Sequence, residues 1–449
     1  MRSTSSRYTS SRYNVPIRRN GALDLVFNCR TGAMVRVPAP LRPILEPLLV
    51  ADGFDLEAVP AAARDLVGDL AEASFFVAEG FDEIEAVKRR LRRARVDTLA
   101  LTVLPTIACN LRCVYCFQAR RGSLMSDATC DALVAEVERR VREEGIERMV
   151  VDWFGGEPLL AHRLIRDLSA RLMAIADRHR LPYRASMATN GTLLDEGMVE
   201  MLAAAGLESI QITLDGPPAV HDRRRPGAGG GPSFDAVLRG ILVASERFRV
   251  NVRINVDRDT VDDAWGVLDR LEAEGCFAPG RDVLPYLALT APLSSICSHT
   301  CGAMLPAEGF FRRVLAFQLA VFERRPDVDL RRLLELPQPL VRGCGAQNDG
   351  GLCVDPAGRV FKCGLEAHDP EHAAGRLSDD YRSHPNYRKW IDRDPFRLPE
   401  CRDCTYLPLC LGGCPKYGAD PDGPFYREAC AYFESCLVPI LATYARARS

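Results

Sequence analysis

The 17 cysteines of this 449-residue chain are concentrated in two places. Three of them fall between Cys109 and Cys116, and eight more lie between Cys344 and Cys430. Residues 1–20 lack the apolar core and the small-residue cleavage site of a secretory signal, so we expect a cytoplasmic protein. Clustered cysteines in such a protein indicate metal ligation rather than disulfide bonds. We therefore expect bound metal to hold together the cysteine-rich C-terminal part, which has little apolar surface to bury.

Charge and hydropathy exclude several kinds of partner. The chain has 58 basic and 60 acidic residues and a formal net charge of −2, which gives no global field that would attract nucleic acid. Its longest apolar runs, such as residues 23–27, are far shorter than the roughly 18 residues that span a bilayer. We therefore expect no nucleic acid and no membrane among the partners, and recognition through a local site.

Six short apolar segments in the middle of the chain alternate with helical patterns. Such alternation is typical of βαβ units, in which helices join parallel strands. The predicted fold class is therefore α/β, and six strands predict a partial (β/α)6 barrel of the TIM type. The expected strands are residues 98–104, 149–153, 185–188, 209–214, 250–256 and 284–289.

The alternation begins and ends within the chain, which predicts further domains on both sides. Two apolar stretches around Arg30–Gly32 predict a hairpin, and helical patterns follow it. Beyond Leu305 one more helical pattern leads into the cysteine-rich part. The expected organisation is a flexible N-terminus at 1–20, a small domain at 21–97, the barrel at 98–306, a bridging helix and linker at 307–342, and a cysteine-rich domain at 343–449.

Cys109, Cys113 and Cys116 form a Cys-x3-Cys-x2-Cys pattern after the first barrel strand. Three thiolates from one tight loop can hold three irons of a [4Fe–4S] cube and leave the fourth iron without a protein ligand. A structural zinc site would need a fourth ligand and usually pairs two Cys-x2-Cys units. The carboxyl end of a barrel strand is also where such barrels place their active sites. The pattern therefore favours a reactive iron–sulfur site.

This pattern resembles the signature of the radical S-adenosylmethionine (SAM) superfamily, with an aromatic residue before the last cysteine. Further segments, one per strand end, are similar to the family's SAM pocket, although each alone also fits an ordinary turn or a structural ion pair. The resemblance implies that a 5′-deoxyadenosyl radical formed from SAM abstracts a hydrogen atom from the substrate. It implies a cofactor site made of Tyr115, Gly155, Gly156, Glu157, Pro158, Thr189, Asn190, Asp215 and Arg253, with Arg253 paired with the SAM carboxylate.

The second group of cysteines resembles the SPASM domain, which carries two auxiliary [4Fe–4S] clusters in many peptide-modifying members of the superfamily. The resemblance implies three clusters in all. One auxiliary cluster would be held by Cys401, Cys404, Cys410 and Cys430, and the other by Cys344, Cys353, Cys363 and Cys414. Cys353 also fits a buried structural cysteine, which would leave an open iron. A zinc ribbon is the alternative for the whole cysteine-rich part, although the spacing of the cysteines there departs from that of paired zinc knuckles.

The small domain at 21–97 resembles the RiPP recognition element, which captures the leader of a ribosomally synthesised precursor peptide as an added strand. The resemblance implies a peptide maturase that forms a thioether or carbon–carbon cross-link and takes electrons from an external donor such as flavodoxin or ferredoxin. One alternative is an anaerobic sulfatase-maturase-like enzyme that oxidises Cys or Ser to formylglycine. A non-catalytic iron–sulfur electron-transfer protein is the alternative from another class, and a mere N-terminal cap is the alternative for the small domain.

Other residues near the strand ends carry less specific signals. We assign no general acid or base, and we expect Arg224 and Arg225 to be solvated, the alternative being that they touch the substrate. Cys297 and Cys301 lie in a polar loop after the last barrel strand, which allows a place near the substrate, although free cysteines are usually inert. The remaining cysteines are expected to be buried as small apolar side chains: Cys29, Cys130, Cys276 and Cys436.

Overall fold

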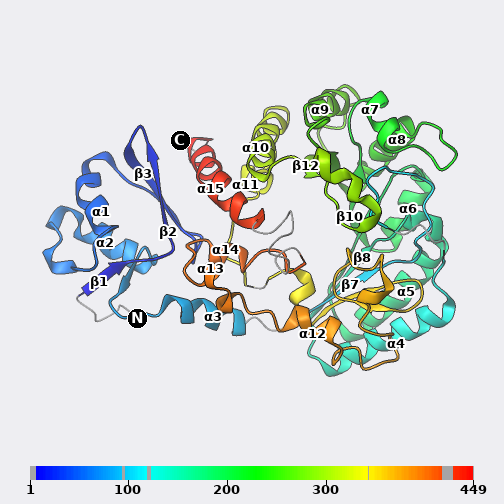
Figure 1. Cartoon of the computed structure of the whole chain (residues 1–449), viewed down its shortest axis with the longest axis horizontal. Helices are drawn as coiled ribbons and strands as arrows, with labels where there is room; N and C mark the ends of the chain where they lie inside the picture. The colour runs from blue at the N-terminus through cyan, green and yellow to red at the C-terminus, as the bar shows by residue number, and fades with distance from the viewer. Residues whose placement is uncertain (1–6, 94–96, 119–122, 342, 417–427, 448–449) are drawn as a thin grey trace. The chain divides into compact units, whose positions relative to one another are not determined.

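The computed structural model describes residues 7–93, 97–118, 123–341, 343–416 and 428–447. The chain forms two compact units (Figure 1). The first contains residues 1–95, 330–344 and 394–449. The second contains residues 96–329 and 345–393. None of the helices in the described ranges is long and apolar enough to cross a membrane.

The second unit is built on an eight-stranded, mostly parallel sheet. Its strand order is β12-β11-β10-β9-β8-β7-β13-β14, so the six strands of the middle of the chain are neighbours in sequence order. This confirms the predicted α/β class and the run of parallel strands. The parallel strands are β7 (Thr98–Val103), β8 (Arg148–Trp153), β9 (Tyr183–Thr189), β10 (Leu207–Thr213), β11 (Arg249–Val256) and β12 (Val283–Leu289).

Two short strands extend this sheet beyond the expected set. β13 (Gly351–Val354) pairs in parallel with β7, and β14 (Val360–Phe361) pairs antiparallel with β13. Both come from the cysteine-rich region, which the sequence analysis treats as one domain at 343–449. In the structure, residues 345–393 belong to the unit with the sheet, whereas residues 394–449 belong to the other unit. The roles assigned to the domains stay predictions.

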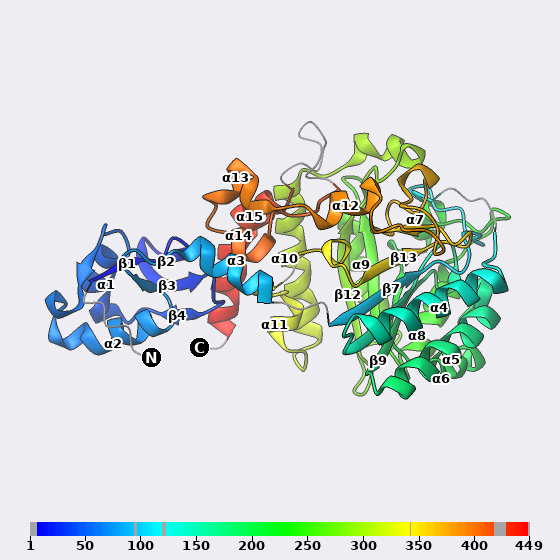
Figure 2. The same cartoon turned by 90° about the horizontal axis from the view of Figure 1, so that it is seen from below.

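Helices cover one face of this sheet because alternate strand residues are apolar. In β7 the side chains of Leu99, Leu101 and Val103 are buried, whereas Thr102 is only partly buried. Figure 2 shows helices along the outer side of the strands. Two of these helices begin with a side-chain cap. The Ser126 hydroxyl accepts a hydrogen bond from the Thr129 N–H, and the Asp195 carboxylate accepts one from the Met198 N–H. The main helices are α4 (Asp127–Glu143), α5 (His162–His179), α6 (Glu196–Ala204), α8 (Phe234–Ala244), α9 (Ala264–Ala273) and α10 (Ala307–Arg324).

The first unit contains two small antiparallel sheets. β3 and β4 form the hairpin expected around Arg30–Gly32, and one sheet face packs on the short helices of the same region. The strands are β2 (Asn14–Arg19), β3 (Ala22–Asn28) and β4 (Met34–Arg36) in one sheet, and β1 (Arg7–Ser10), β5 (Phe54–Asp55) and β6 (Phe76–Ala78) in the other. The helices are α1 (Arg42–Leu48), α2 (Ala61–Glu72) and α3 (Glu83–Arg93).

The other face of the β2-β3-β4 sheet packs against the C-terminal part of the chain. Leu25, Phe27 and Cys29 share one apolar core with Leu437 and Leu441 of helix α15 (Glu428–Ala447). These residues are separated by about four hundred positions in sequence, so no local pattern predicts their contact. The N-terminal strands and the last helix therefore stabilise each other.

We expect the substitution Leu437→Ala to destabilise this unit by about 2–5 kcal/mol, the usual cost of emptying a buried leucine site. Leu437 has no exposed surface, whereas Val50, in the same unit, is 81% exposed and offers a matched control. Limited proteolysis should show faster cleavage within residues 7–93 for Leu437→Ala and unchanged cleavage for Val50→Ala. Equal cleavage of the two variants would show that the N-terminal strands do not depend on α15.

Candidate active site

A cavity of about 630 Å³ opens at the carboxyl ends of the parallel strands in the second unit. All three cysteines of the Cys-x3-Cys-x2-Cys loop line it. Polar side chains at alternate positions of the strands line the rest, as the period of two in a strand requires. These are Thr102, Asp152, Ser186, Gln211, Asn251, Arg253 and Asn255. The sequence analysis missed most of them, although their alternation with buried apolar residues was the available signal.

Hydrogen bonds hold the cysteine loop in place. The Arg112 N–H donates to the Pro226 carbonyl oxygen at 2.7 Å, and the Val114 N–H donates to the Arg224 carbonyl oxygen at 2.9 Å. Donors also point at sulfur, since the Leu111 N–H lies 3.4 Å from the Cys109 Sγ atom. The loop is thus fixed by the segment that follows β10, which lies about a hundred residues later in the sequence.

Two thiols of this loop, those of Cys109 and Cys113, are in an environment that disfavours an isolated thiolate. Burial raises the pKa of Cys113 to about 11, and the nearby Arg225 guanidinium opposes that rise. Burial also raises the pKa of Cys109. In the described ranges, no group of three or more His, Cys, Asp or Glu side chains is arranged to hold a single metal ion. Cysteines that share one iron–sulfur cube bind different irons, so their sulfur atoms need not converge on one point.

Two glycines allow a second loop to pack closely on the cysteine loop. A Cβ atom on Gly155 would lie 2.4 Å from the Thr106 carbonyl oxygen, and one on Gly156 would lie 2.2 Å from that of Ala108. Both distances are too short for any side chain. Gly155 also has a φ angle of 123°, which favours glycine. The two glycines therefore form a cradle beside the cysteines that larger residues would fill.

Six of the nine residues predicted to bind the cofactor line the cavity, namely Tyr115, Gly155, Gly156, Thr189, Asn190 and Arg253. The other three, Glu157, Pro158 and Asp215, are not among its lining residues. Glu157 is fully buried, and its carboxylate accepts hydrogen bonds from the Thr189 hydroxyl and the Asn190 N–H, both at 2.7 Å. It therefore ties two strand ends together behind the cavity wall.

Asp215 lies in a similar supporting position. Its carboxylate accepts a hydrogen bond from the Tyr115 hydroxyl and another from the Asn255 N–H at 2.9 Å. Tyr115 is thereby fixed by its hydroxyl group. Burial raises the pKa of Tyr115 well above its ordinary value, so the hydroxyl group stays protonated and donates to Asp215. The residue before the last cysteine thus connects the cysteine loop to the end of β10.

The expectation that Arg224 and Arg225 are solvated is wrong. Their exposed fractions are 6% and 5%. Helix α7 (Pro218–Arg224) brings both side chains back over the strand ends, where Arg224 forms an ion pair with Asp257. Arg225 lines the cavity. Two adjacent arginines in a predicted loop usually indicate solvent exposure, and only the tertiary structure shows that this loop folds inward.

The family model of the Radical SAM superfamily matches residues 103–271, which include the cysteine loop and most of the strand ends around the cavity. The chain contains a radical SAM domain. It is 24% identical over 354 residues to the serine-type anaerobic sulfatase-maturating enzyme of Klebsiella aerogenes, covering 74% of this chain and 84% of that protein. It is 28% identical over 353 residues to the mycofactocin maturase MftC of Mycobacterium ulcerans, covering 72% and 87%.

The fold of the chain is also similar to the crystal structure of Streptococcus suis SuiB bound to precursor peptide SuiA. The TM-score is 0.52 at 14% identity, and the match covers 93% of this chain and 98% of SuiB. The relatives in sequence are named as maturating enzymes, and the radical SAM chain is an enzyme. The superfamily implies SAM and a [4Fe–4S] cluster as cofactors. The alternative of a non-catalytic electron carrier is thereby set aside.

The predicted auxiliary ligands are distributed over both units. In the first unit, burial raises the pKa of Cys404 and Cys410; Cys430 lies close enough to add to the rise at Cys404, and Cys404, Cys401 and Cys430 lie close enough to add to the rise at Cys410. The structure thus brings this predicted set together. The other set is divided, since Cys353 and Cys363 belong to the second unit and Cys344 and Cys414 to the first.

Cys363 and Cys353 differ in their surroundings. Cys363 lines the cavity together with the cysteine loop. Cys353 lies on β13 in an apolar core with Leu104 and Phe361, and its burial raises its pKa. This buried position fits either a cluster ligand or a structural cysteine. Cys297 is fully buried and is not among the residues that line the cavity, and the side chain of Cys301 lies outside the described part.

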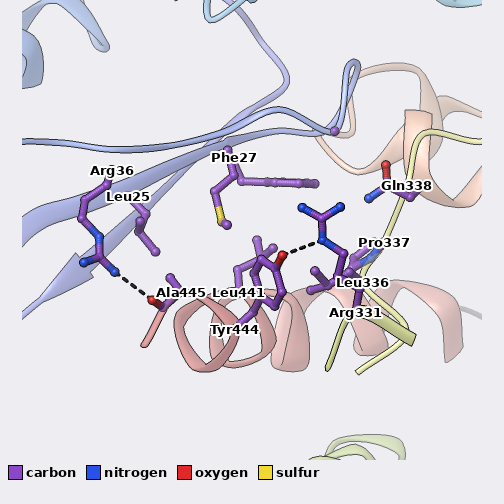
Figure 3. Close-up of a pocket in the computed structure, with 12 residues that line it drawn as sticks. Leu25, Phe27, Arg36, Arg331, Leu336, Pro337, Gln338, Leu441, Tyr444 and Ala445 are labelled. Atoms are coloured by element: carbon purple, nitrogen blue, oxygen red, sulfur yellow. Dashed lines mark hydrogen bonds between the residues drawn. The ribbon is translucent and has the colours of Figure 1, made fainter. Parts of the chain in front are cut away.

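A second cavity, of about 440 Å³, lies within the first unit between the β2-β3-β4 sheet and helix α15 (Figure 3). Leu25, Phe27 and Met34 line its sheet side, and Leu441 and Tyr444 line its helix side. At one end the Arg36 guanidinium donates to the Ala445 carbonyl oxygen at 2.9 Å. At the other end Arg331 donates to the Tyr444 hydroxyl at 2.5 Å. We name this the sheet–helix cleft.

Proposed function

We propose that this radical SAM enzyme oxidatively modifies a ribosomally synthesised precursor peptide and forms a thioether or carbon–carbon cross-link in it. The observation that carries the proposal is the cavity that brings Cys109, Cys113 and Cys116 together with Arg253 and the Gly155–Gly156 cradle. Two relatives in sequence, a sulfatase-maturating enzyme and a mycofactocin maturase, support a peptide or protein substrate. SuiB, whose fold is similar, was crystallised with a precursor peptide.

The residues of the cavity fit the two cofactors that the superfamily implies. Three thiols from one loop supply the donor set of a [4Fe–4S] cluster with one open iron, and the glycine cradle leaves room beside it. When bound, the cluster and SAM supply a radical that abstracts an unactivated hydrogen atom from the substrate. Arg253, which lines the cavity from β11, is our candidate for pairing with the SAM carboxylate.

Other residues of the chain hold this pocket in shape. Glu157 ties the loops after β8 and β9 together, and Asp215 fixes Tyr115 and Asn255. We therefore propose that Glu157 and Asp215 act through the residues they hold rather than by touching SAM. Closing the strand ends in this way also keeps water away from reactive groups, which radical chemistry requires.

Two auxiliary [4Fe–4S] clusters are part of the proposal and would accept the electron that the substrate releases on forming a new bond. The proximity of Cys401, Cys404, Cys410 and Cys430 supports one of them. Cys363 at the cavity supports the other, because a ligand there would place electron acceptance next to the substrate. An external donor such as flavodoxin or ferredoxin would supply the electron that starts the reaction.

We further propose that the N-terminal domain binds the leader of the peptide at the edge of β4. The Asn28 N–H bonds to the Ala33 carbonyl and the Val37 N–H to the Asp24 carbonyl. In an antiparallel pair these bonds alternate, so the backbone groups of Met34 and Arg36 point away from β3. An added strand could pair there and direct alternate side chains into the sheet–helix cleft (Figure 3).

Mass spectrometry of the product tests the proposed function. The enzyme, reconstituted anaerobically and reduced, is incubated with SAM and with a precursor peptide encoded beside its gene. We expect a product that has lost two hydrogen atoms, does not react with a hydrazine and gives fragments joined between two side chains. A sulfatase-derived peptide with Cys or Ser at the modified position serves as the comparison substrate.

The sulfatase-maturase-like alternative is favoured by the name of the Klebsiella aerogenes relative. Oxidation of Ser to formylglycine also removes two hydrogen atoms, but it creates an aldehyde that reacts with hydrazines. A hydrazine adduct on the sulfatase-derived peptide, with no change in the precursor peptide, would therefore replace the cross-linking proposal by this one.

A further inference from the structure

Arg225 is a buried cation at the cavity wall that forms no direct ion pair with any carboxylate of the described residues. Its Nη1 atom donates a hydrogen bond to the Tyr115 hydroxyl oxygen at 2.7 Å. Its Nε atom is buried and has no hydrogen-bond partner within the described ranges. Among the same residues, no carboxylate oxygen lies within 4.0 Å of its guanidinium group. Burying an unpaired charge costs several kcal/mol, so this position is built for an anion.

The other two arginines near the cavity have different surroundings. Arg224 forms an ion pair with Asp257, which neutralises its charge. Arg253 lies on β11 and is only partly buried, and it is our candidate for the SAM carboxylate. Arg225 is fixed instead by Tyr115, which lies within the cysteine loop. Its charge therefore lies on the side of the cavity that the cysteine loop lines.

Tyr115, which accepts the hydrogen bond from Arg225, lies two residues after Cys113 in the cysteine loop. The pKa of Arg225 is raised: burial lowers it, but the attraction of Cys113, Tyr115 and Asp215 together raises it more. Val114, adjacent to Cys113, donates its N–H to the Arg224 carbonyl oxygen at 2.9 Å, so Arg225 and Cys113 belong to neighbouring segments. Both residues line the same cavity. Because Arg225 is buried, the attraction between its guanidinium group and a thiolate is stronger than at the surface.

We propose that Arg225 is a positioning residue that acts through Cys113 and raises the reduction potential of the iron–sulfur cluster held by the cysteine loop. The inference rests on the proposed cluster site. One-electron reduction by the external donor adds one negative charge to the thiolate-bound irons. A fixed cation beside one thiolate favours the state with the greater negative charge, and so favours electron uptake.

The test is an anaerobic redox titration followed by electron paramagnetic resonance, using dithionite and mediators, on reconstituted full-length protein without SAM. The signal that changes when SAM is added identifies the cluster concerned. We expect Arg225→Met to lower its reduction equilibrium constant at least tenfold, which is about 59 mV for one electron. Arg225→Lys should restore much of the potential, because it keeps the charge.

Two further variants make the outcome decisive. Arg223→Met removes an exposed arginine two residues earlier, in helix α7, and should leave the potential unchanged. Arg225→Gln keeps a donor for Tyr115 and replaces Arg225→Met if the latter fails to fold. A potential equal to that of Arg223→Met, with weaker SAM binding, would overturn the inference and assign Arg225 to SAM. Wild-type protein without such a cluster would instead contradict the proposed function itself.

Discussion

Replacement of Cys109, Cys113 and Cys116 by alanine should abolish the formation of 5′-deoxyadenosine from SAM and remove about four irons of about twelve per chain. The physical reason is that the three thiols line one cavity and come from one loop, so no other cysteine of that loop can take their place. The auxiliary sites do not depend on this loop for their predicted ligands. They should therefore keep about eight irons.

Cys276→Ala is the matched control for this triple variant. Cys276 belongs to the same unit and is fully buried, but it does not line the cavity. Iron, labile sulfide and 5′-deoxyadenosine are measured on anaerobically reconstituted protein of each variant. If the triple variant keeps the full iron content and cleaves SAM as Cys276→Ala does, the cysteine loop is not the cofactor site.

The sequence predicts the second unit well because its signals are local. Apolar strands, the cysteine spacing and glycines at strand ends each act over a few residues. These local signals do not distinguish the residues that line the cavity from those that lie behind its wall. Glu157 follows directly on Gly156, yet its carboxylate turns away from the cavity toward Thr189 and the Asn190 N–H. Only the fold of two neighbouring loops decides that direction.

Long-range contacts explain the other differences. Arg225 is buried because α7 folds back over the strand ends. From the sequence alone, two adjacent arginines predict exposure to solvent. β13 joins β7 by parallel pairing across about 250 residues, which no local periodicity encodes. The core shared by Phe27 and Leu437 joins the two ends of the chain in the same way. Sequence patterns thus identify elements and ligands, whereas tertiary packing decides which of them meet.

Replacement of Cys401, Cys404 and Cys410 by alanine should separate SAM cleavage from product formation. These cysteines lie in the first unit, whereas the cysteine loop lies in the second. We expect the variant to lose about four irons and to keep forming 5′-deoxyadenosine, while the modified peptide falls to background. The cause is that the electron released by the substrate would lack an acceptor, so SAM cleavage would become unproductive.

Cys29→Ala provides a demanding control for this prediction. Cys29 is fully buried, and Cys404 and Cys410 both affect its ionisation, so it is a thiol next to the predicted ligands. It lies in the apolar core beside Phe27, which favours a packing role, and its removal should cost no iron. If Cys29→Ala also lost about four irons, Cys29 would be a ligand that the cysteine spacing could not reveal. If instead the triple variant still made the modified peptide, electron acceptance would not depend on this set.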